Sequence, residues 1–374
     1  MIYEIEAKSI LRKHKRIDSW FISSYGINLY RGCTHNCVYC DGRHEKYQVN
    51  NQFGRDIEIK TNALELLDKE LDPSRKRKPM NNGFVVICGG VSDSYQPLEK
   101  KYELTRKTLE LLLKYKHPVH LLTKSTLIER DIDLIKKIDD KKKALVSFSF
   151  STVENKLSKI LEPGASSPQE RLNTIKRFKD AGISCGMFLM PVVPFISDSK
   201  DMIEESVSKA KDAGVDYIIF GGMTLKEGKQ KDYFMNFIQG NYPLLIKNFS
   251  QMYSEDNLWG TPNLKYGNPI EKSFESVATK YKIPKRIPAH LFSSLVTKTE
   301  LAILILEQLD YCARIKGLNS PYRYSAHELH KLNQNIEDMS TDELLKIKGI
   351  GPVTEKIIRE IIETGTSSFY KKTL

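Results

Sequence analysis

Short apolar runs alternate with amphipathic segments of helical period between residues 26 and 222. Apolar runs bounded by turn residues are typical of buried strands, and apolar positions repeating every three or four residues are typical of helices that cover a sheet. The expected strands are 27–30, 84–88, 119–123, 145–150, 185–190 and 217–220. Six successive strand–helix units predict a parallel sheet with right-handed crossovers.

Six units rather than eight favour an α/β fold of the partial (β/α)6 TIM-barrel type, with an open doubly wound sheet as the alternative. In the fourth strand, "VSFSFST", a period of two places Ser147, Ser149 and Ser151 on one face. Phe148 and Phe150 lie on the other face and are expected to meet the helices. The serines would then line a ligand-filled interior, because a solvated face is unusual in the middle of a parallel sheet.

The pattern changes after residue 225, where irregular and helical segments replace the strand–helix units. A long apolar helix follows Thr297 and opens an all-helical tail. We therefore expect four regions, which are a basic N-terminal arm (1–23), the barrel (24–225), a barrel-closing extension and linker (226–296) and a helical domain (297–374).

The composition, with 40% apolar residues in 374, is that of a globular protein. No apolar run is long enough to cross a bilayer, and the N-terminal residues lack the apolar segment of a secretory signal. We expect a cytoplasmic protein with no membrane partner. Three cysteines lie in one cluster and the others are isolated at Cys88, Cys185 and Cys312, which is unlike a secreted disulfide framework. The cluster indicates a metal site.

The net charge of +11 favours a polyanionic partner such as nucleic acid, although a basic surface can also serve solubility alone. Residues 301–374 contain ten basic and ten acidic residues. The whole positive excess therefore lies in residues 1–300.

The cluster lies in "YRGCTHNCVYC", with Cys33, Cys37 and Cys40 directly after the first expected strand. So short a loop can hold three corners of a cubane iron–sulfur cluster and leave one iron without a protein ligand. A small molecule can occupy that iron. The alternatives are a zinc site that borrows His35 or His44, or a redox pair at Cys37 and Cys40, and each leaves a cysteine unexplained.

The spacing Cys-x3-Cys-x2-Cys, with the aromatic Tyr39 before the third cysteine, resembles the radical SAM superfamily. The resemblance implies a [4Fe–4S] cluster on Cys33, Cys37 and Cys40, with S-adenosylmethionine (SAM) chelating the fourth iron. It also implies a one-electron donor such as a ferredoxin or flavodoxin.

Other candidate contacts with SAM fall after later strands, on the face where barrel enzymes place their chemistry. Gly89 and Gly90 resemble the superfamily's glycine pair, which accepts the SAM amino group, although such a pair alone is usually a turn. Lys124 is either a SAM ligand or a lysine on the rim. The further candidates are Tyr39, Ser92, Ser149 and Ser151.

Five segments resemble the spore photoproduct lyase-like group of DNA repair photolyases: "GCTHNCVYCDGR", "DSYQPLEKKYELTRKTLELL", "LLTKS", "LEPGASSPQERL" and "MPVVPFISD". The resemblance implies that a 5′-deoxyadenosyl radical takes hydrogen from a damaged thymine pair, and that a cysteine returns one. The family's cysteine lies two residues before a Ser-Asp pair, where this chain has Gly90. Cys88, with Tyr95 as a substitute, is therefore the candidate donor; otherwise Cys88 is a small buried residue.

The tail contains "IKGIGP" between two helical patterns and resembles a helix-hairpin-helix motif over 342–364. Glycines in such a turn let backbone amides at the second helix approach a phosphate. The expected DNA contacts are Lys348, Gly349, Gly351, Thr354 and Lys356. The alternative is a helical hairpin used for packing or partner docking.

These features favour a radical SAM enzyme that acts on a nucleotide in DNA, as a lyase on lesions, after extruding the base. A second hypothesis keeps the radical enzyme but gives it RNA or a small molecule as substrate, with the tail used for assembly. A third is a non-catalytic iron–sulfur protein that binds nucleic acid.

Overall fold

The computed structural model describes all residues except 48–51, 76–79, 88–90, 255–258 and 333. Its strands are β1 Ile2–Ile5, β2 Leu11–Asp18, β3 Ser23–Ile27, β4 Tyr30–Arg31, β5 Ile57–Lys60, β6 Phe84–Ile87, β7 Val119–Thr123, β8 Ala144–Phe150, β9 Ser184–Val192 and β10 Tyr217–Gly222. The helices up to residue 281 are α1 Ala63–Leu71, α2 Glu99–Tyr102, α3 Leu104–Lys114, α4 Ile132–Lys141, α5 Asn155–Leu161, α6 Pro168–Asp180, α7 Lys200–Asp212, α8 Lys229–Asn241, α9 Ile246–Met252 and α10 Leu264–Tyr281. The C-terminal helices are α11 Lys298–Ile315, α12 Tyr322–Leu329, α13 Thr341–Leu345, α14 Pro352–Thr364 and α15 Ser368–Thr373.

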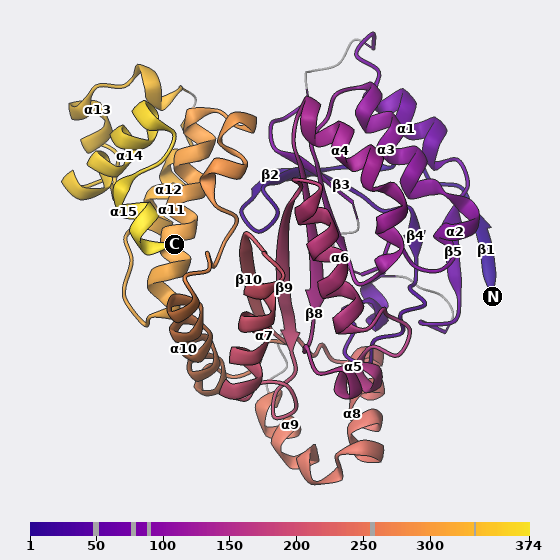
Figure 1. Ribbon diagram of the computed structural model, residues 1–374. Helices are drawn as coiled ribbons and strands as arrows, with labels where there is room; N and C mark the ends of the chain where they lie inside the picture. Colours follow the sequence, from indigo (N-terminus) through magenta and orange to yellow (C-terminus); the bar gives the residue numbers. More distant parts are fainter. Residues whose placement is uncertain (48–51, 76–79, 88–90, 255–258, 333) are drawn as a thin grey trace.

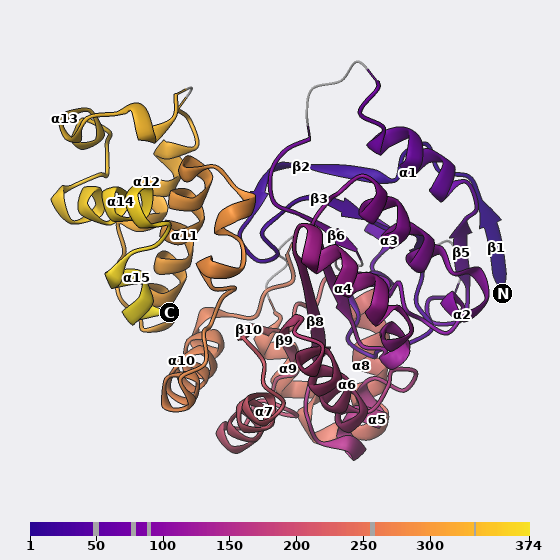
Figure 2. The same ribbon diagram turned by 45° about the horizontal axis from the view of Figure 1, so that its top comes forward.

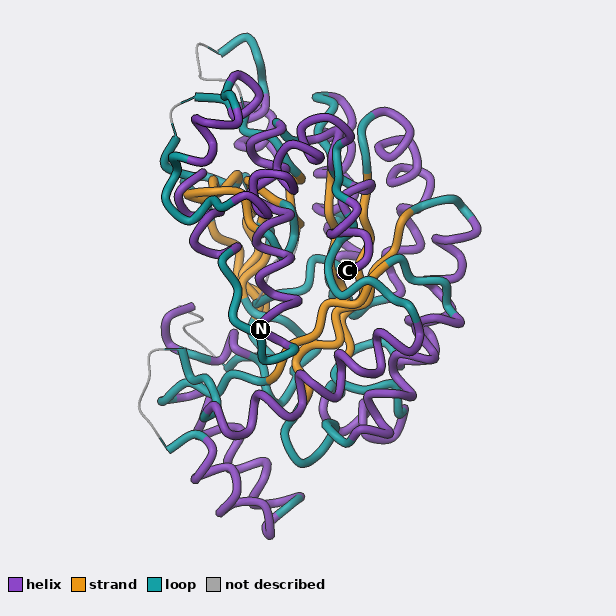
Figure 3. The backbone as a smooth tube through the Cα atoms, turned by 90° about the vertical axis from the view of Figure 1, so that its left-hand side faces the viewer, coloured by secondary structure: helices purple, strands orange, loops and turns teal. Residues whose placement is uncertain are grey.

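The main sheet has the strand order β10-β9-β8-β7-β6-β3-β2. Its neighbours are parallel except at the edge, where β2 runs antiparallel to β3. Helices α3, α4 and α6 cover one face (Figure 1), and the tube view shows helices around the outside of the strands (Figure 3). The prediction of a partial barrel with a helical C-terminal region is confirmed.

The first barrel strand lies earlier than predicted, at Ser23–Ile27 instead of 27–30. Asn28 causes the shift, because its side-chain oxygen accepts the Tyr30 N–H at 3.1 Å and turns the chain away from the sheet. Tyr30–Arg31 then pairs with β5 in a separate three-stranded sheet. The cysteine loop therefore starts from this small sheet.

The N-terminal residues, expected to be a basic arm, instead form strands in both sheets. β1 pairs with β5, and β2 is the edge strand of the barrel. The basic run from Arg12 to Arg16 lies on β2. Charged side chains on an edge strand discourage pairing with other chains, so the run has a structural role as well.

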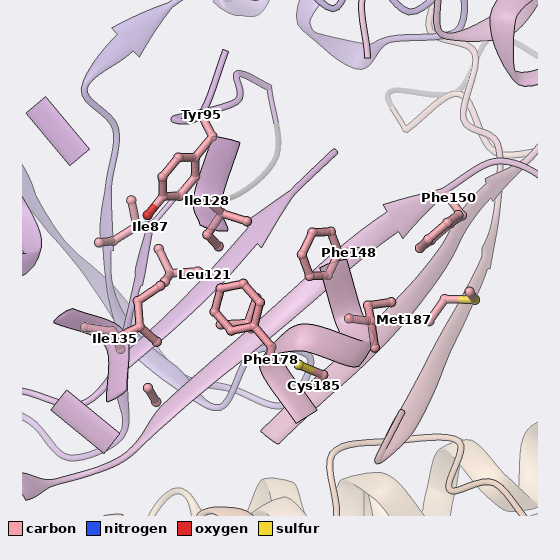
Figure 4. Close-up of a cluster of buried hydrophobic side chains, with 14 of the residues drawn as sticks. Ile87, Tyr95, Leu121, Ile128, Ile135, Phe148, Phe150, Phe178, Cys185 and Met187 are labelled. Atoms are coloured by element: carbon pink, nitrogen blue, oxygen red, sulfur yellow. The ribbon is translucent and has the colours of Figure 1, made fainter. Parts of the chain in front are cut away.

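The two faces of the barrel strands differ as the alternation in β8 predicts. On the outer face, Phe148 packs against Phe178 of α6 with ring centroids 6.4 Å apart (Figure 4). On the inner face, the Ser147 hydroxyl lies 2.8 Å from both the Tyr217 hydroxyl and Nε2 of His120. Ser147, His120 and Tyr217 therefore form a packed plug that fills the lumen near the amino ends of the strands. Only Ser149 and Ser151, nearer the carboxyl ends, remain available to a ligand.

The C-terminal helices close the barrel at the amino ends of its strands. The Ile218 N–H donates to the Pro284 carbonyl at 2.9 Å, and the Gly83 N–H donates to the Leu295 carbonyl at 3.0 Å, so 284–295 crosses from β10 to β6. The inner residues Phe84 and Phe188 share one apolar cluster with α11. Figure 2 shows the helical unit beside β2. None of the helices in the described ranges is long and apolar enough to cross a membrane.

His120 makes the stability of the plug depend on pH. Its ring is buried and its Nδ1 lies 3.1 Å from the Phe21 carbonyl, and burial lowers its pKa to about 4. In the unfolded chain the pKa of histidine is about 6.5, so the unfolded state binds more protons below that pH. The stabilisation that the neutral, buried His120 contributes to the folded state is therefore complete above pH 6.5 and is lost as pH falls towards 4.

We therefore expect the free energy of unfolding of the natural chain to fall, between pH 7 and 4, by about 3 kcal/mol more than that of a His120→Gln variant. Urea unfolding of both proteins across this range measures the difference. Parallel pH profiles for the two proteins would contradict a neutral buried His120.

Candidate functional site

The loop 32–44 carries the three clustered cysteines at the carboxyl end of the barrel. Cys33 and Cys37 are buried and Cys40 is half-buried, and none of the three forms a disulfide with a described residue. Burial raises the pKa of each thiol, that of Cys37 to about 12. The thiols lie close enough for the charges of Cys37 and Cys40 to raise the pKa of Cys33 further.

Backbone N–H groups partly counteract the rise in pKa of two of these thiols. The N–H of His35 donates to the Cys33 sulfur and that of Gly42 to the Cys40 sulfur, which lowers each pKa. N–H bonds to sulfur are characteristic of iron–sulfur ligands, and three such thiols on one loop fit a cubane cluster.

A site for a single metal ion, such as zinc, fits the cysteine loop less well than a cubane cluster does. Within the described residues, no group of three His, Cys, Asp or Glu side chains is placed to hold one metal ion. His35 instead faces Asp93, with Nδ1 3.4 Å from Oδ2, and Nδ1 of His44 accepts the Lys46 N–H at 3.0 Å. A cubane spreads its ligands over separate irons, farther apart than around one ion.

Two side chains from the loop after β6 tie the cysteine loop to the sheet. Gln96 accepts the Thr34 N–H at 3.1 Å and donates to the Gly32 carbonyl at 3.4 Å. The buried Asp93 carboxylate faces His35 and also accepts the Thr123 hydroxyl at 2.7 Å and the Lys124 N–H at 2.8 Å. The ends of β6 and β7 are thereby fixed to the loop.

The segment 161–167 packs against the other side of the loop. The Val38 N–H donates to the Leu161 carbonyl, and the Gly164 N–H donates to the His35 carbonyl, both at 3.0 Å. A Cβ on Gly164 would lie 2.3 Å from the Thr34 carbonyl oxygen. Only glycine lets the two backbones approach this closely.

The extension after β10 supports the loop from outside. The Arg43 guanidinium donates to the Cys37 carbonyl at 3.3 Å and lies 3.5 Å from the ring centroid of Tyr233 in α8. Asp41 pairs with Lys226 and accepts the Thr224 hydroxyl. The region expected to close the barrel therefore also covers the cysteine loop.

A buried carboxylate, Glu162, joins three elements around the site. It accepts the Tyr39 hydroxyl and lies 3.2 Å from Nζ of Lys124 and 2.6 Å from Nη2 of Arg171. Burial alone would raise the pKa of Glu162, but the two cations hold it well below its usual value. Glu162 is therefore ionised.

Sequence reasoning missed Glu162 and Arg171 as site residues. Both lie in "LEPGASSPQERL", which carried only the family resemblance. A Glu and an Arg nine residues apart on either side of a helix start give no signal of contact, because their pairing depends on how α5 and α6 meet.

Three predicted SAM contacts come together here. Lys124 lies beside Tyr39, with Nζ 5.9 Å from the ring centroid, and donates to the Ser149 hydroxyl at 2.5 Å. The Ser151 hydroxyl is fully buried and has no hydrogen-bond partner among the described residues. An orphaned buried hydroxyl is costly, so it fits a polar ligand that completes the site.

The other candidates are placed differently. Ser92 donates to the Tyr30 carbonyl at 3.1 Å, which holds its loop against the small sheet. Cys88, Gly89 and Gly90 lie outside the described residues. Tyr95 is buried with Ile87 and Ile128 in the layer between the sheet and the helices (Figure 4). Its ring is thus outside the lumen where a hydrogen donor would act.

The predicted hairpin is α13, the turn 346–351 and α14. Gly349 has φ +87°, and a Cβ there would lie 2.4 Å from Tyr324, so glycine is required. Gly351 is the N-cap of α14 and is exposed, as are Lys348 and Lys356. Thr354 faces the core of the helical unit and is only 3% exposed, so it is not available to a ligand.

The fold and the cysteine loop define an iron–sulfur barrel protein. Residues 27–204 match the model of the radical SAM superfamily, and the chain belongs to that superfamily. Its cofactors are accordingly a [4Fe–4S] cluster and SAM.

Among curated proteins, the chain is 30% identical to the uncharacterized protein Rv2578c of Mycobacterium tuberculosis over 61% of its own length and 67% of the relative's. It is 29% identical to the uncharacterized protein MJ0683 of Methanocaldococcus jannaschii, over 59% and 77% respectively. Among solved structures, spore photoproduct lyase complexed with dinucleoside spore photoproduct superposes with a TM-score of 0.55 at 14% identity, over 75% of this chain and 79% of that one. This likeness shows a common fold.

Because Gly164 has no room for a side chain, we expect Gly164→Ala to displace the cysteine loop and to destabilise the chain by about 1 to 3 kcal/mol. Iron bound per chain after anaerobic reconstitution should fall with it. Gly240→Ala is the matched control, because no atom lies within 4 Å of its new Cβ inside α8. Equal iron content in the two variants would contradict the role of this contact.

Proposed function

We propose that the chain is a radical SAM enzyme that acts on a nucleotide in DNA, as a lesion lyase similar to spore photoproduct lyase. The observation that carries the proposal is the polar group at the carboxyl end of the barrel, where Lys124 lies beside Tyr39 of the three-cysteine loop and donates to Ser149, and where the Ser151 hydroxyl that follows β8 is buried without a partner among the described residues. A non-catalytic cluster would have no use for such polar groups.

In this proposal Cys33, Cys37 and Cys40 hold three irons of the cluster and leave the fourth for SAM. When bound, the cluster supplies one electron that cleaves SAM and yields a 5′-deoxyadenosyl radical able to abstract hydrogen. An electron donor such as a ferredoxin or flavodoxin would reduce the cluster.

The chain's own residues would bind and orient SAM. Glu162 keeps the ammonium of Lys124 in place, and this cation suits the SAM carboxylate. Ser149 and Ser151 suit hydroxyl or carboxylate groups farther along the ligand. Because Glu162 and Arg171 compensate each other in a buried position, the site keeps its shape with little water inside.

DNA as the substrate is supported by three separate features. The whole positive excess lies in residues 1–300, outside the C-terminal helical region, and suits a phosphate backbone. The exposed Lys348 and Gly351 of the hairpin suit phosphate contacts that position a duplex without reading its sequence. The likeness in fold to spore photoproduct lyase, whose structure holds a dinucleoside spore photoproduct, adds a precedent.

The hydrogen donor in this proposal remains Cys88, which directly follows Ile87, the last residue of β6, in the sequence. Tyr95, its substitute, lies in the outer layer and would need a rearrangement to reach the lumen.

Anaerobic turnover with reductant and SAM tests the proposal. We expect 5′-deoxyadenosine to form faster with ultraviolet-irradiated DNA than with unirradiated DNA or irradiated RNA, and the damaged base to be consumed. Cys33→Ala should abolish the reaction, whereas Cys185→Ala should retain it, because Cys185 lies in the apolar layer outside the barrel.

Chromatography of the nucleoside and mass spectrometry of the digested DNA provide the two measurements. SAM cleavage that is indifferent to DNA would favour RNA or a small molecule as substrate. Absence of cleavage in a protein that holds its cluster would contradict the enzyme.

A further inference from the structure

A second cavity, of about 760 Å³, lies where the turn after β2 meets α11 and α12. Ser19 and Trp20 line it from the β2 side, and Arg286 from the segment that closes the barrel. These residues are near the amino ends of the strands, whereas the cysteine loop is at the carboxyl ends. The cavity is therefore distinct from the cofactor site.

Arginines dominate the charges around this cavity. Arg16 is 3.7 Å from Glu307, and Arg314 is 3.0 Å from Asp310, so two of the four arginines have a carboxylate partner. Arg286 and Arg323 form no ion pair within 4 Å among the described residues, although the carboxylates of Asp18 and Glu271 act on Arg286 from farther away. The arginines that line the cavity thus outnumber its lining carboxylates, Glu307 and Asp310, by four to two.

The position of Arg286 points to an anionic ligand. Its side chain is only 3% exposed, and its guanidinium lies 3.3 Å from the ring centroid of Tyr311 and 4.5 Å from that of Trp20. The one hydrogen bond that it donates to a described residue is to the Lys285 carbonyl, at 3.3 Å. A buried cation that no carboxylate contacts directly is costly, and a guanidinium matches phosphate in geometry.

Tyr311 provides a second, independent observation. Its side chain is 7% exposed and lines the cavity, and its buried hydroxyl has no hydrogen-bond partner in the described part of the chain. Buried hydroxyls are normally paired, so a ligand in the cavity would satisfy it.

The cavity also adjoins the hairpin through Tyr324, which is 41% exposed. Nζ of Lys348 lies 5.8 Å from the ring centroid of Tyr324, and Gly349 packs against the same ring. Aromatic rings interleaved with arginines suit both halves of a nucleotide, since bases stack on rings and phosphates pair with guanidinium groups.

We propose that this cavity binds a nucleotide, with its phosphate at Arg286 and Arg323 and its base beside Trp20. Continuity with the hairpin favours a nucleotide within a DNA strand over a free one. The bound nucleotide is not the reacting one, because the cysteine loop is at the other end of the barrel. This inference goes beyond the function proposed above and does not depend on SAM chemistry.

The chain has two tryptophans, so Trp259→Phe leaves Trp20 as the sole tryptophan and a reporter of the cavity. We expect saturable quenching of its fluorescence by a short oligo(dT) in the cluster-loaded protein without SAM. Adding Arg323→Ala should weaken binding several-fold and lower the slope of log affinity against log salt by about 0.7, the value for one lost contact with single-stranded nucleic acid. Lys176→Ala, which removes an exposed charge from α6, should change neither.

Titration with thymidine 5′-monophosphate separates the two sources of the ligand. Tighter binding of the oligonucleotide, weakened by Arg323→Ala, supports a strand. Tighter binding of the mononucleotide, with the same sensitivity, supports a free nucleotide in the same cavity. Absence of saturable quenching by both, or equal effects of Arg323→Ala and Lys176→Ala, overturns the proposal, whatever the outcome of the turnover assay.

Discussion

The site depends on one buried carboxylate, that of Glu162. It is the common partner of Tyr39 on the cysteine loop, Lys124 after β7 and Arg171 on α6. Removal of one partner from a buried ion pair leaves an uncompensated charge, at a cost of about 3 to 5 kcal/mol. The three elements are therefore held in one arrangement, and the cysteine loop cannot shift without breaking it.

The barrel separates chemistry from support along its axis. At the amino ends of the strands, His120, Ser147 and Tyr217 fill the lumen and the C-terminal helices cover it. At the carboxyl ends, Lys124 lies beside Tyr39 of the cysteine loop and donates to Ser149 of β8. Parallel strands require this polarity, because the loops that follow them all open on one face.

Periodicity in the sequence was enough to predict five of the six barrel strands closely. A strand that is buried on both faces is apolar along most of its length, and such a run is easy to recognise. It was wrong for the first strand, where the side chain of Asn28 competes with the sheet for the Tyr30 N–H. It also missed β2 as a strand, since the charges of an edge strand hide the pattern.

The sequence predicted those parts of the candidate site that a short, contiguous motif identifies. The cysteine spacing identifies its own loop, Lys124 directly follows β7, and Ser149 lies near the end of β8 on the face that the alternation predicts. Glu162, Arg171 and Gly164 were not predictable in their roles, since these roles come from contacts between segments distant in sequence. The outward orientation of Tyr95 was not predictable either, because a residue after a strand can turn to either face of the sheet.

The central claim is that three cysteines hold a cluster whose fourth iron is open to SAM. Mössbauer spectroscopy of protein reconstituted with isotopically enriched iron tests it most directly. The account predicts that SAM changes the signal of a single iron of the cluster, and that Cys37→Ala loses the cluster. An unchanged spectrum on adding SAM, or a complete cluster in Cys37→Ala, would contradict it.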